Sequence, residues 1–289
     1  MTVTVSSLHL HPIKACGRVD VATAEIGRHG LVGDREWQVV DPDGTPLTQR
    51  THPRLATVRP EPVDGGLVLR ADGADELAID RPLDGTPLTV RDLVGLPIDL
   101  LDAGSAATAW FSALLGTDAR LVVAGPDYDR TIPPQLDHLW SDAALGDLAP
   151  VLLTSSSSLA ALVAEASEPF GMDRFRPNLV IDGAEAWDED TWASVRVGAA
   201  TATSCVGWPR CAVPQVDQLT GERHREPAKV LRARRWCTDA SEGPAGFADA
   251  LEGSALFGVG AALGPAGTTV SVGDEVTVLE RGPNLLARS

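Results

Sequence analysis

Alternation of hydrophobic and polar residues predicts short strands through the first 100 residues. The stretches that alternate or carry β-branched residues are residues 3–13, 36–41, 66–70 and 88–92. Asp-Gly and Gly-Gly pairs lie between them, and such pairs favour tight turns. Asp43-Gly44, between two such stretches, predicts a hairpin.

Two segments have a helical rather than an alternating pattern. Residues 105–116 place Ala107, Trp110 and Leu114 on one face, and Gly116 is a typical helix end. Residues 159–167 form a second apolar helical pattern, which opens on the four serines at 155–158. We predict one helix in each half of the chain.

Further strands are predicted after a polar stretch at residues 125–147. They are residues 149–154 and 178–182, a hairpin formed by 192–198 and 200–207, and residues 268–280 with a Gly-Asp turn. Two helices among many short strands predict an α+β fold, predominantly β, with a curled sheet or barrel in each half. The polar stretch is either a connection between domains or a long surface loop.

Composition narrows the possible partners. The chain has 289 residues, with 24 Lys and Arg against 40 Asp and Glu, which gives a net charge of −16. This charge argues against nucleic acid and against anionic lipid as partners. No apolar run is long enough to span a membrane, and the first residues lack a secretory pattern, so a cytoplasmic protein is expected.

Common catalytic and metal motifs are missing from the sequence. The four cysteines are too sparse for a disulfide scaffold and form no C-x-x-C pair. The six histidines have no H-E-x-x-H spacing, and there is no G-x-S-x-G, P-loop or G-x-G-x-x-G motif. Several frequent enzyme classes are thereby excluded.

Thr154 and Ser155 end a predicted strand at the start of a helix. Their hydroxyls, together with free backbone N–H groups and the positive end of the helix, would suit an anion. The simpler alternative is an ordinary helix N-cap, and the sequence alone favours it.

Arg174 and Arg176 lie just before the strand at 178–182. Pro177 lacks an N–H group and favours an extended chain, so it would hold Arg176 and Asn178 rigidly. A guanidinium suits phosphate or the edge of a heterocycle, and the Asn amide can recognise a ring amide. A loop arginine in a surface ion pair is the alternative.

Cys211 follows Arg210 directly, and a positive neighbour favours the thiolate, the form that binds metals or attacks substrates. A buried inert thiol is the alternative, and it is the default for Cys205 and Cys237. Considered one at a time, Lys14 and Arg35 are expected to be charges at the protein surface. If the fold brings them to the pocket of Arg176 and Arg210, the four cations would form a strong phosphate site.

The order and spacing of several segments resemble the MOSC proteins, specifically the two-part group that includes the mitochondrial amidoxime-reducing components and their bacterial relatives. The segments in the first half are HPIKAC, GDREW and TQRTHPRL. Those in the second half are DLAPVLLTSSSSL, RFRPNLVIDG, AWDEDTW, PRCAVPQVDQLTG, SALFGVGAAL and TTVSVGDEVTVL. The resemblance covers nearly the whole chain.

The resemblance implies two interlocked parts with a cofactor in the cleft between them. They are an N-terminal β-rich MOSC-associated domain over residues 1–125 and a β-barrel-like MOSC domain over residues 135–285. It also implies a molybdenum cofactor, a pterin dithiolene whose metal takes one protein ligand, and no pyridoxal phosphate. Cys211 matches that ligand and is the implied catalytic residue.

Positions that match the family's pterin and phosphate contacts are Lys14, Arg35, Ser155, Arg176, Asn178 and Arg210. Thr154 joins them on the anion-site argument above. Asp147 falls on a family position and is expected to order the pocket.

The implied function is a molybdenum-dependent reductase of N-hydroxylated compounds such as amidoximes, hydroxylamines and N-hydroxylated bases. Electrons are expected from a separate protein, whether a ferredoxin, a cytochrome or a flavin reductase. With a charge of −16, docking of an acidic ferredoxin would need a local basic patch. The alternatives are a cofactor or sulfur-carrier binding protein without turnover, and a thiol enzyme without metal.

The sequence departs from the family pattern near the implied ligand. Val213-Pro214-Gln215 stands where two threonines are common, the loop before Cys211 is longer, and Ala15 replaces a frequent serine. These departures leave the substrate preference open. Cys205 is a secondary candidate for the metal ligand.

Overall fold

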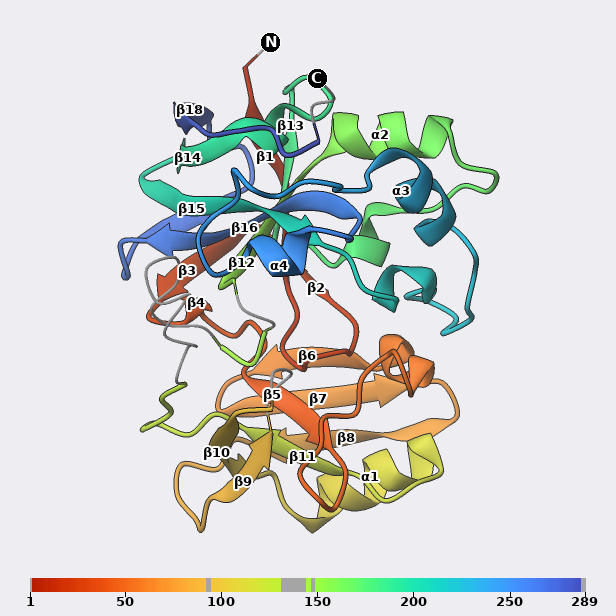
Figure 1. The fold of residues 1–289 in the computed structure, drawn as a ribbon. Coiled ribbons are helices and arrows are strands. Elements are labelled where there is room, and N and C mark those ends of the chain that lie inside the picture. Colours follow the sequence, from red (N-terminus) through yellow and green to blue (C-terminus); the bar gives the residue numbers. More distant parts are fainter. Residues whose placement is uncertain (1, 92–94, 131–143, 147–148, 287–289) are drawn as a thin grey trace.

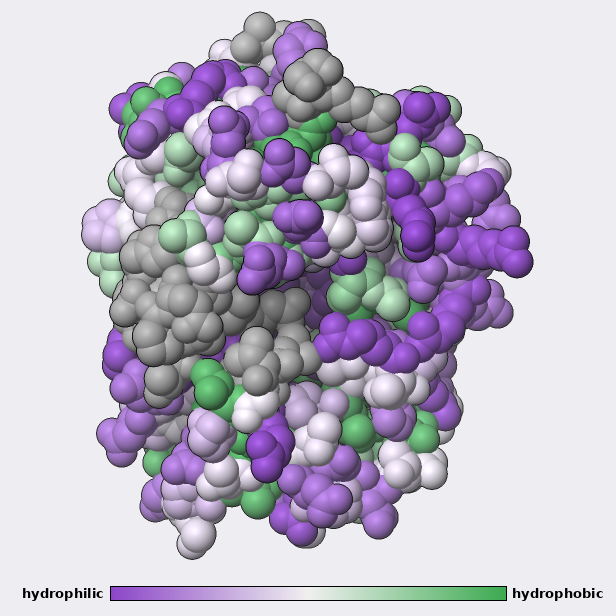
Figure 2. Space-filling view, in the orientation of Figure 1, coloured by the Kyte–Doolittle hydropathy of each residue, from purple (hydrophilic) through white to green (hydrophobic). Residues whose placement is uncertain are grey.

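The computed structural model describes residues 2–91, 95–130, 144–146 and 149–286. Figure 1 shows two parts, one above the other: a larger sheet with most of the helices above, and smaller sheets with fewer helical segments below. The fold is α+β and predominantly β, as predicted. On the face shown in Figure 2, hydrophilic residues cover most of the coloured surface, and hydrophobic residues form only small separate areas.

The upper part is built on an eight-stranded sheet. In order across the sheet, its strands are β18 (Val276–Arg281), β14 (Trp192–Val197), β15 (Ala200–Pro209), β16 (Leu256–Gly264), β12 (Val151–Ser155), β13 (Leu179–Asp182), β1 (Thr4–Leu10) and β2 (Val19–Val21). Only β12 and β13 are parallel neighbours. A second sheet packs against it: β17 (Thr269–Ser271), β3 (Thr23–Gly27) and β4 (Gly30–Leu31).

The large sheet curls into a barrel-like layer. The N–H of Val5 in β1 donates to the carbonyl of Asp274 at 2.9 Å, and the N–H of Gly273 donates to the carbonyl of Val5 at 2.8 Å. These bonds join β1 to the segment that precedes β18, which lies at the other side of the sheet. The backbone groups of Val5 and Gly273 are thereby paired within the chain.

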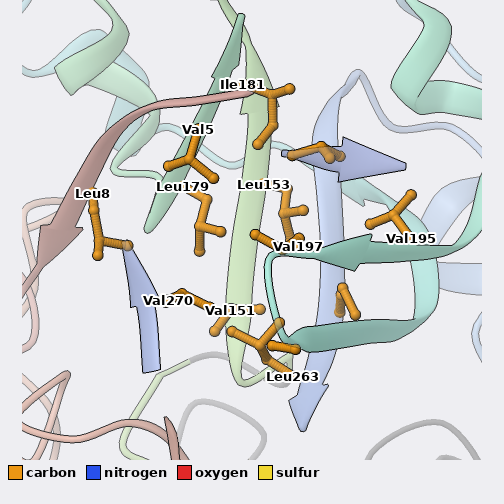
Figure 3. Close-up of a cluster of buried hydrophobic side chains, with 14 of the residues drawn as sticks. Val5, Leu8, Val151, Leu153, Leu179, Ile181, Val195, Val197, Leu263 and Val270 are labelled. Carbon is orange, nitrogen blue, oxygen red and sulfur yellow. The ribbon is translucent and has the colours of Figure 1, made fainter. Parts of the chain in front are cut away.

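Apolar side chains fill the interior of this layer. Figure 3 shows valines, leucines and isoleucines from strands far apart in the sequence pointing toward one another. Val5 and Leu8 belong to β1 and are each 1% exposed, and Leu153, Leu179 and Ile181 are fully buried. The first 31 residues thus contribute strands to the sheet of the second half, because the apolar face of β1 is covered only there. A division at residues 125 and 135 stays a prediction.

The lower part contains two smaller sheets and one helix. They are a sheet of β5 (Trp37–Val40), β11 (Arg120–Val123), β10 (Pro97–Asp102) and β9 (Leu88–Arg91), a sheet of β6 (Arg59–Val63), β7 (Gly66–Ala71) and β8 (Ala74–Asp80), and helix α1 (Ser105–Leu115). Helix α1 ends at Gly116 in the left-handed conformation, as predicted. Ala107 and Leu114 are buried, but the buried aromatic side chain is Phe111 rather than Trp110.

The remaining helices lie in the upper part (Figure 1). They are α2 (Ser156–Ala164), α3 (Ala228–Arg234) and α4 (Ala248–Leu251), with 3-10 turns η2 (Met172–Phe175), η3 (Asp188–Thr191) and η4 (Val213–Gln215). A further 3-10 turn, η1 (Pro53–Thr57), lies in the lower part beside β6. Helix α2 was predicted, whereas α3 and α4 span seven and four residues and are too short for a periodic pattern. No helix within the described ranges has the length and apolar character needed to cross a bilayer.

The predicted strands are confirmed, but two predicted turns connect differently. The Asp43-Gly44 turn forms, yet the chain after it makes only a single bridge, between Val40 and Pro46. The two strands at residues 268–280 pair with different partners, β17 with β3 and β18 with β14. Much of the polar stretch at residues 125–147 lies outside the described residues.

Candidate functional site

A cavity between the two parts collects residues from both. Its empty space, counted out into the open solvent at its mouth, is about 880 Å³. Its lining residues are Lys14, Ala15, Arg35, Thr48, Gln49, Arg50, Gly146, Ala149, Val151, Leu152, Phe175, Arg176, Asn178, Trp208, Pro209, Arg210, Cys211 and Val213. Five of these are cations, and none of the described lining residues is Asp or Glu. In a chain of net charge −16, this is a focused positive site suited to an anion.

The backbone is strained at this cavity. Ala15, Arg35 and Arg176 have φ values of 69°, 51° and 55°, in the left-handed region that disfavours side chains. Among the described residues only one other non-glycine, Trp187, has a positive φ. Such strain costs about 1–3 kcal/mol per residue and clusters at functional sites. Three of the four strained positions therefore line one cavity.

Asn178 is a hub that fixes Arg35. Its Oδ1 accepts hydrogen bonds from the Arg35 guanidinium at 3.0 Å and from the N–H of Leu152 at 3.1 Å. Its Nδ2 donates to the carbonyl of His9 at 3.2 Å. The other Arg35 nitrogen donates to the carbonyl of Arg176 at 3.0 Å. Asn178 is fully buried, so these bonds are shielded from competing water.

His11 and Asp34 hold the Arg35 side of the site in place through further contacts. The backbone N–H of His11 donates to Asp34 Oδ1 at 2.7 Å, and Asp34 also pairs with Arg35. His11 Nε2 lies 3.2 Å from the carbonyl of Pro177 and must donate, because a carbonyl only accepts. Burial, with the nearby Arg176 and Arg35 charges, lowers the pKa of His11 well below 6.5. His11 is therefore neutral and adds no charge.

Arg176 links the two parts through a pair of glutamines. Its guanidinium donates to the carbonyl of Cys16 at 2.5 Å and to Gln218 Oε1 at 3.1 Å. Gln218 and Gln49 exchange two amide hydrogen bonds, each 2.9 Å long. Gln49 also donates to the carbonyl of Ala15 at 2.7 Å. The network ties the N-terminal part to the segment that follows η4.

Lys14 and Arg210 are held by neutral acceptors. Lys14 Nζ donates to the carbonyl of Gly146 at 3.2 Å. The Arg210 guanidinium donates to the carbonyl of Phe175 at 2.8 Å and lies over the Phe175 ring, 5.4 Å from its centroid. A carbonyl oxygen orients a cation without cancelling its charge, and both residues line the cavity.

Cys211 follows β15 and precedes η4, and its side chain is exposed on the cavity. Arg174 fixes the turn after it by donating to the carbonyl of Gln215 at 3.2 Å and to Asp217 at 2.8 Å. Arg174 is itself buried and does not line the cavity. The ion-pair alternative thus describes Arg174, while Arg176 reaches the site.

The other cysteines lie in apolar packing. Burial raises the pKa of the Cys16 thiol and that of the Cys205 thiol to about 12, and it also raises the pKa of Cys237. Cys205 packs against the barrel core and does not line the cavity of Cys211. Across the described ranges, no group of three or more His, Cys, Asp or Glu could hold a metal ion.

Thr154 and Ser155 do not reach the cavity, which corrects the sequence prediction. They are 1% and 0% exposed, and their hydroxyls bond within the fold, Thr154 to the Leu179 carbonyl and Ser155 to Ser157. The cavity meets β12 at its first residues, Val151 and Leu152, whereas these two residues end the strand. Asp147 lies outside the described residues, between Gly146 and Ala149, which do line the cavity.

Several lining residues were missed by sequence reasoning. Gln49 and Arg50 come from the TQR segment, and Trp208 lies just before Arg210. A Cβ on Gly260 in β16 would overlap the Trp208 ring, so this glycine lets the ring lie against the strand. The segments carried the resemblance, but nothing local indicated that they face Cys211.

The chain is similar to two family profiles and to several known proteins. The profile of the MOSC N-terminal beta barrel domain matches residues 2–118, and that of the MOSC domain matches residues 141–277. Mitochondrial amidoxime reducing component 2 of Bos taurus is 36% identical over 94% of this chain and 82% of its own length. The chain belongs to the two-part MOSC family.

Two further relatives are similar to it. Human mitochondrial amidoxime-reducing component 1 is 32% identical over 96% of this chain and 83% of its own length. The molybdenum cofactor sulfurase of Danio rerio is 29% identical over 79% of this chain but only 30% of its own length. The family resemblance seen in the sequence is thus confirmed.

Proposed function

We propose that this protein is a molybdenum cofactor-dependent oxidoreductase that reduces N-hydroxylated compounds. One observation carries the proposal: an exposed thiol, Cys211, shares a cavity with five cations and no described carboxylate. A pterin cofactor with an anionic phosphate and a thiophilic metal needs both features. The names of the relatives, which refer to amidoxime reduction and to the molybdenum cofactor, support the same ligand.

The residues present fit this group. Cys211 would hold the metal, because thiolate sulfur suits such metals and no other described cysteine lines the cavity. Lys14, Arg35, Arg176 and Arg210 would hold the phosphate and the pterin edge, with Asn178 orienting Arg35. When bound, the cofactor supplies two-electron redox chemistry at an N–O bond.

The chain itself would orient the bound ligand and provide an apolar side of the cavity. Hydrogen bonds to protein oxygens fix four of the cations, Lys14, Arg35, Arg176 and Arg210, so these four need little reorganisation on binding. The half-buried Trp208 forms an apolar side of the cavity against which a planar substrate can lie. Two electrons and two protons convert an N–OH group to N–H and water, and the electrons come from a separate donor protein.

The test is molybdenum content and turnover in matched cysteine variants, expressed in a cofactor-competent host. Wild type should carry molybdenum and reduce benzamidoxime with a chemical electron donor. Cys211→Ser should lose both properties, and Cys205→Ser should keep both. Full metal content in Cys211→Ser would refute the assignment of the ligand.

Two outcomes would favour the alternatives. Pterin binding without reduction of any amidoxime would indicate a cofactor or sulfur carrier in place of an enzyme. Activity that needs Cys211 in a protein free of molybdenum would indicate a thiol enzyme.

A further inference from the structure

Arg50 differs from the other cations of the cavity. Lys14, Arg35, Arg176 and Arg210 each donate to a protein oxygen within the site. The Arg50 side chain lines the cavity and is half-buried, yet it makes no hydrogen bond or ion pair with any residue in the described ranges. Its guanidinium therefore keeps all of its donors for a ligand.

The backbone that carries Arg50 is nevertheless held firmly. A nitrogen of Arg223 donates to the carbonyls of Gln49 and Arg50, at 3.1 and 2.5 Å. The N–H of Arg50 donates to Thr48 Oγ1 at 3.3 Å. The backbone of Arg50 is thus fixed, while its guanidinium makes no hydrogen bond within the described ranges. Arg223 adds a second positive charge next to that backbone.

An unpaired guanidinium beside four other cations is electrostatically unfavourable. The four pinned cations are arranged for one ligand of fixed shape, which is the cofactor in the proposed function. Arg50 enters from the N-terminal part, whereas Cys211 and Val213 line the cavity from the MOSC part. An anion near Arg50 would relieve the repulsion without displacing any hydrogen bond of the protein.

The surroundings indicate what else such a ligand carries. The half-buried Trp208 supplies aromatic surface, and the partly exposed Ala149 and Val213 continue the apolar side. A ligand that fits combines a planar apolar body with an oxyanion such as a carboxylate or a phosphate.

We propose that Arg50 is a substrate-selecting residue that favours N-hydroxylated compounds bearing a carboxylate or a phosphate. This inference rests on the proposed function, because it concerns the substrate of the same site. Arg50 binds the anionic group of the substrate, which lies away from the N–O bond, and takes no part in cleaving that bond.

The experiment compares substrate pairs that share a reacting group. One pair is benzamidoxime and 4-carboxybenzamidoxime, and the other is an N-hydroxylated nucleoside and its 5′-monophosphate. A charge-assisted contact predicts that Arg50→Gln lowers kcat/KM for the anionic members by about tenfold or more and leaves the neutral members within about twofold. Arg50→Lys should restore part of the loss, since it keeps the charge without the planar fork.

Three further readouts separate this role from the alternatives. Molybdenum content of Arg50→Gln should equal that of wild type. Binding of the unreactive products benzamidine and 4-carboxybenzamidine, measured by calorimetry on the loaded protein, should show the same selective loss. Arg120→Gln, which removes a half-exposed arginine outside the cavity, should change nothing.

The outcomes distinguish failure of this inference from failure of the proposed function. If the neutral and anionic members fall equally, or if Arg50→Gln loses molybdenum, Arg50 belongs to the cofactor site and the inference is wrong. If only the carboxylate or only the phosphate pair responds, that anion is the one selected. A loaded wild-type protein that reduces no N-hydroxylated compound overturns the proposed function itself.

Discussion

The reciprocal amide pair of Gln49 and Gln218 should be a strong link between the two parts of the molecule. Gln49 is fully buried, and its amide takes part in three hydrogen bonds, two with Gln218 and one with the carbonyl of Ala15. Gln49→Met preserves the approximate volume and removes all three. At about 1 kcal/mol each, the free energy of unfolding should fall by about 3 kcal/mol.

A double-mutant cycle isolates the link itself. Gln218→Met removes the same two amide bonds, so the double variant loses them only once. The combined cost should be smaller than the sum of the single costs by about 2 kcal/mol. Urea unfolding at 25 °C measures this as a shift in midpoint at constant slope.

Gln38 provides a matched control for the same chemical change. It lies in β5, is 2% exposed, and its Nε2 has no hydrogen-bond partner within the described part of the chain. Gln38→Met should therefore leave the stability unchanged or raise it, because no bond is lost and a buried polar group is removed. The reasoning fails if Gln38→Met destabilises as much as Gln49→Met, or if the coupling lies within about 0.5 kcal/mol of zero.

Two other changes test a buried carboxyl group in η3 and the packing of Trp208, which lines the cavity. Burial and the neighbouring Asp190 raise the pKa of Glu189 from 4.5 to about 7, so its neutral form stabilises the fold below pH 4.5 and this contribution is lost as the pH rises through 7. Relative to Glu189→Gln, wild type should lose about 3 kcal/mol of unfolding free energy between pH 4.5 and 8, measured by urea unfolding, and a difference independent of pH would contradict this. Gly260→Ala places a methyl group against the Trp208 ring. The free energy of unfolding should fall by about 1–3 kcal/mol, and kcat/KM for benzamidoxime should fall as well. Unchanged stability and activity would show that the ring is free to move.

The regular elements could largely be predicted because their signals are local. Alternation predicted the strands that became β1, β5 and β7, and Gly116 marked the end of α1. The pairing of those strands could not be predicted in this way. Whether β17 joins β18 or β3 depends on which apolar faces meet in the barrel, and residues far apart in sequence decide that.

The residues of the candidate site also divide into those that local sequence indicates and those that it does not. Arg176, Asn178, Arg210 and Cys211 were identifiable because Pro177 and the Arg-Cys pair are unusual local patterns, and the structure brings all four to one cavity. Ser155 had an equally suggestive pattern, yet it is buried at the far end of β12. Hydroxyl content alone does not say which end of a strand faces a cavity.

By itself, the sequence determined the fold class, the family and the chemical types available: one thiol next to an arginine, and cations separated along an acidic chain. Only the tertiary structure decided which of them act together. It closed a barrel-like sheet that includes β1, brought Arg50 and Cys211 to one cavity, and linked the parts through Gln49 and Gln218. The physical reason is that periodicity is a property of neighbours along the chain, whereas an electrostatic site is a sum over neighbours in space.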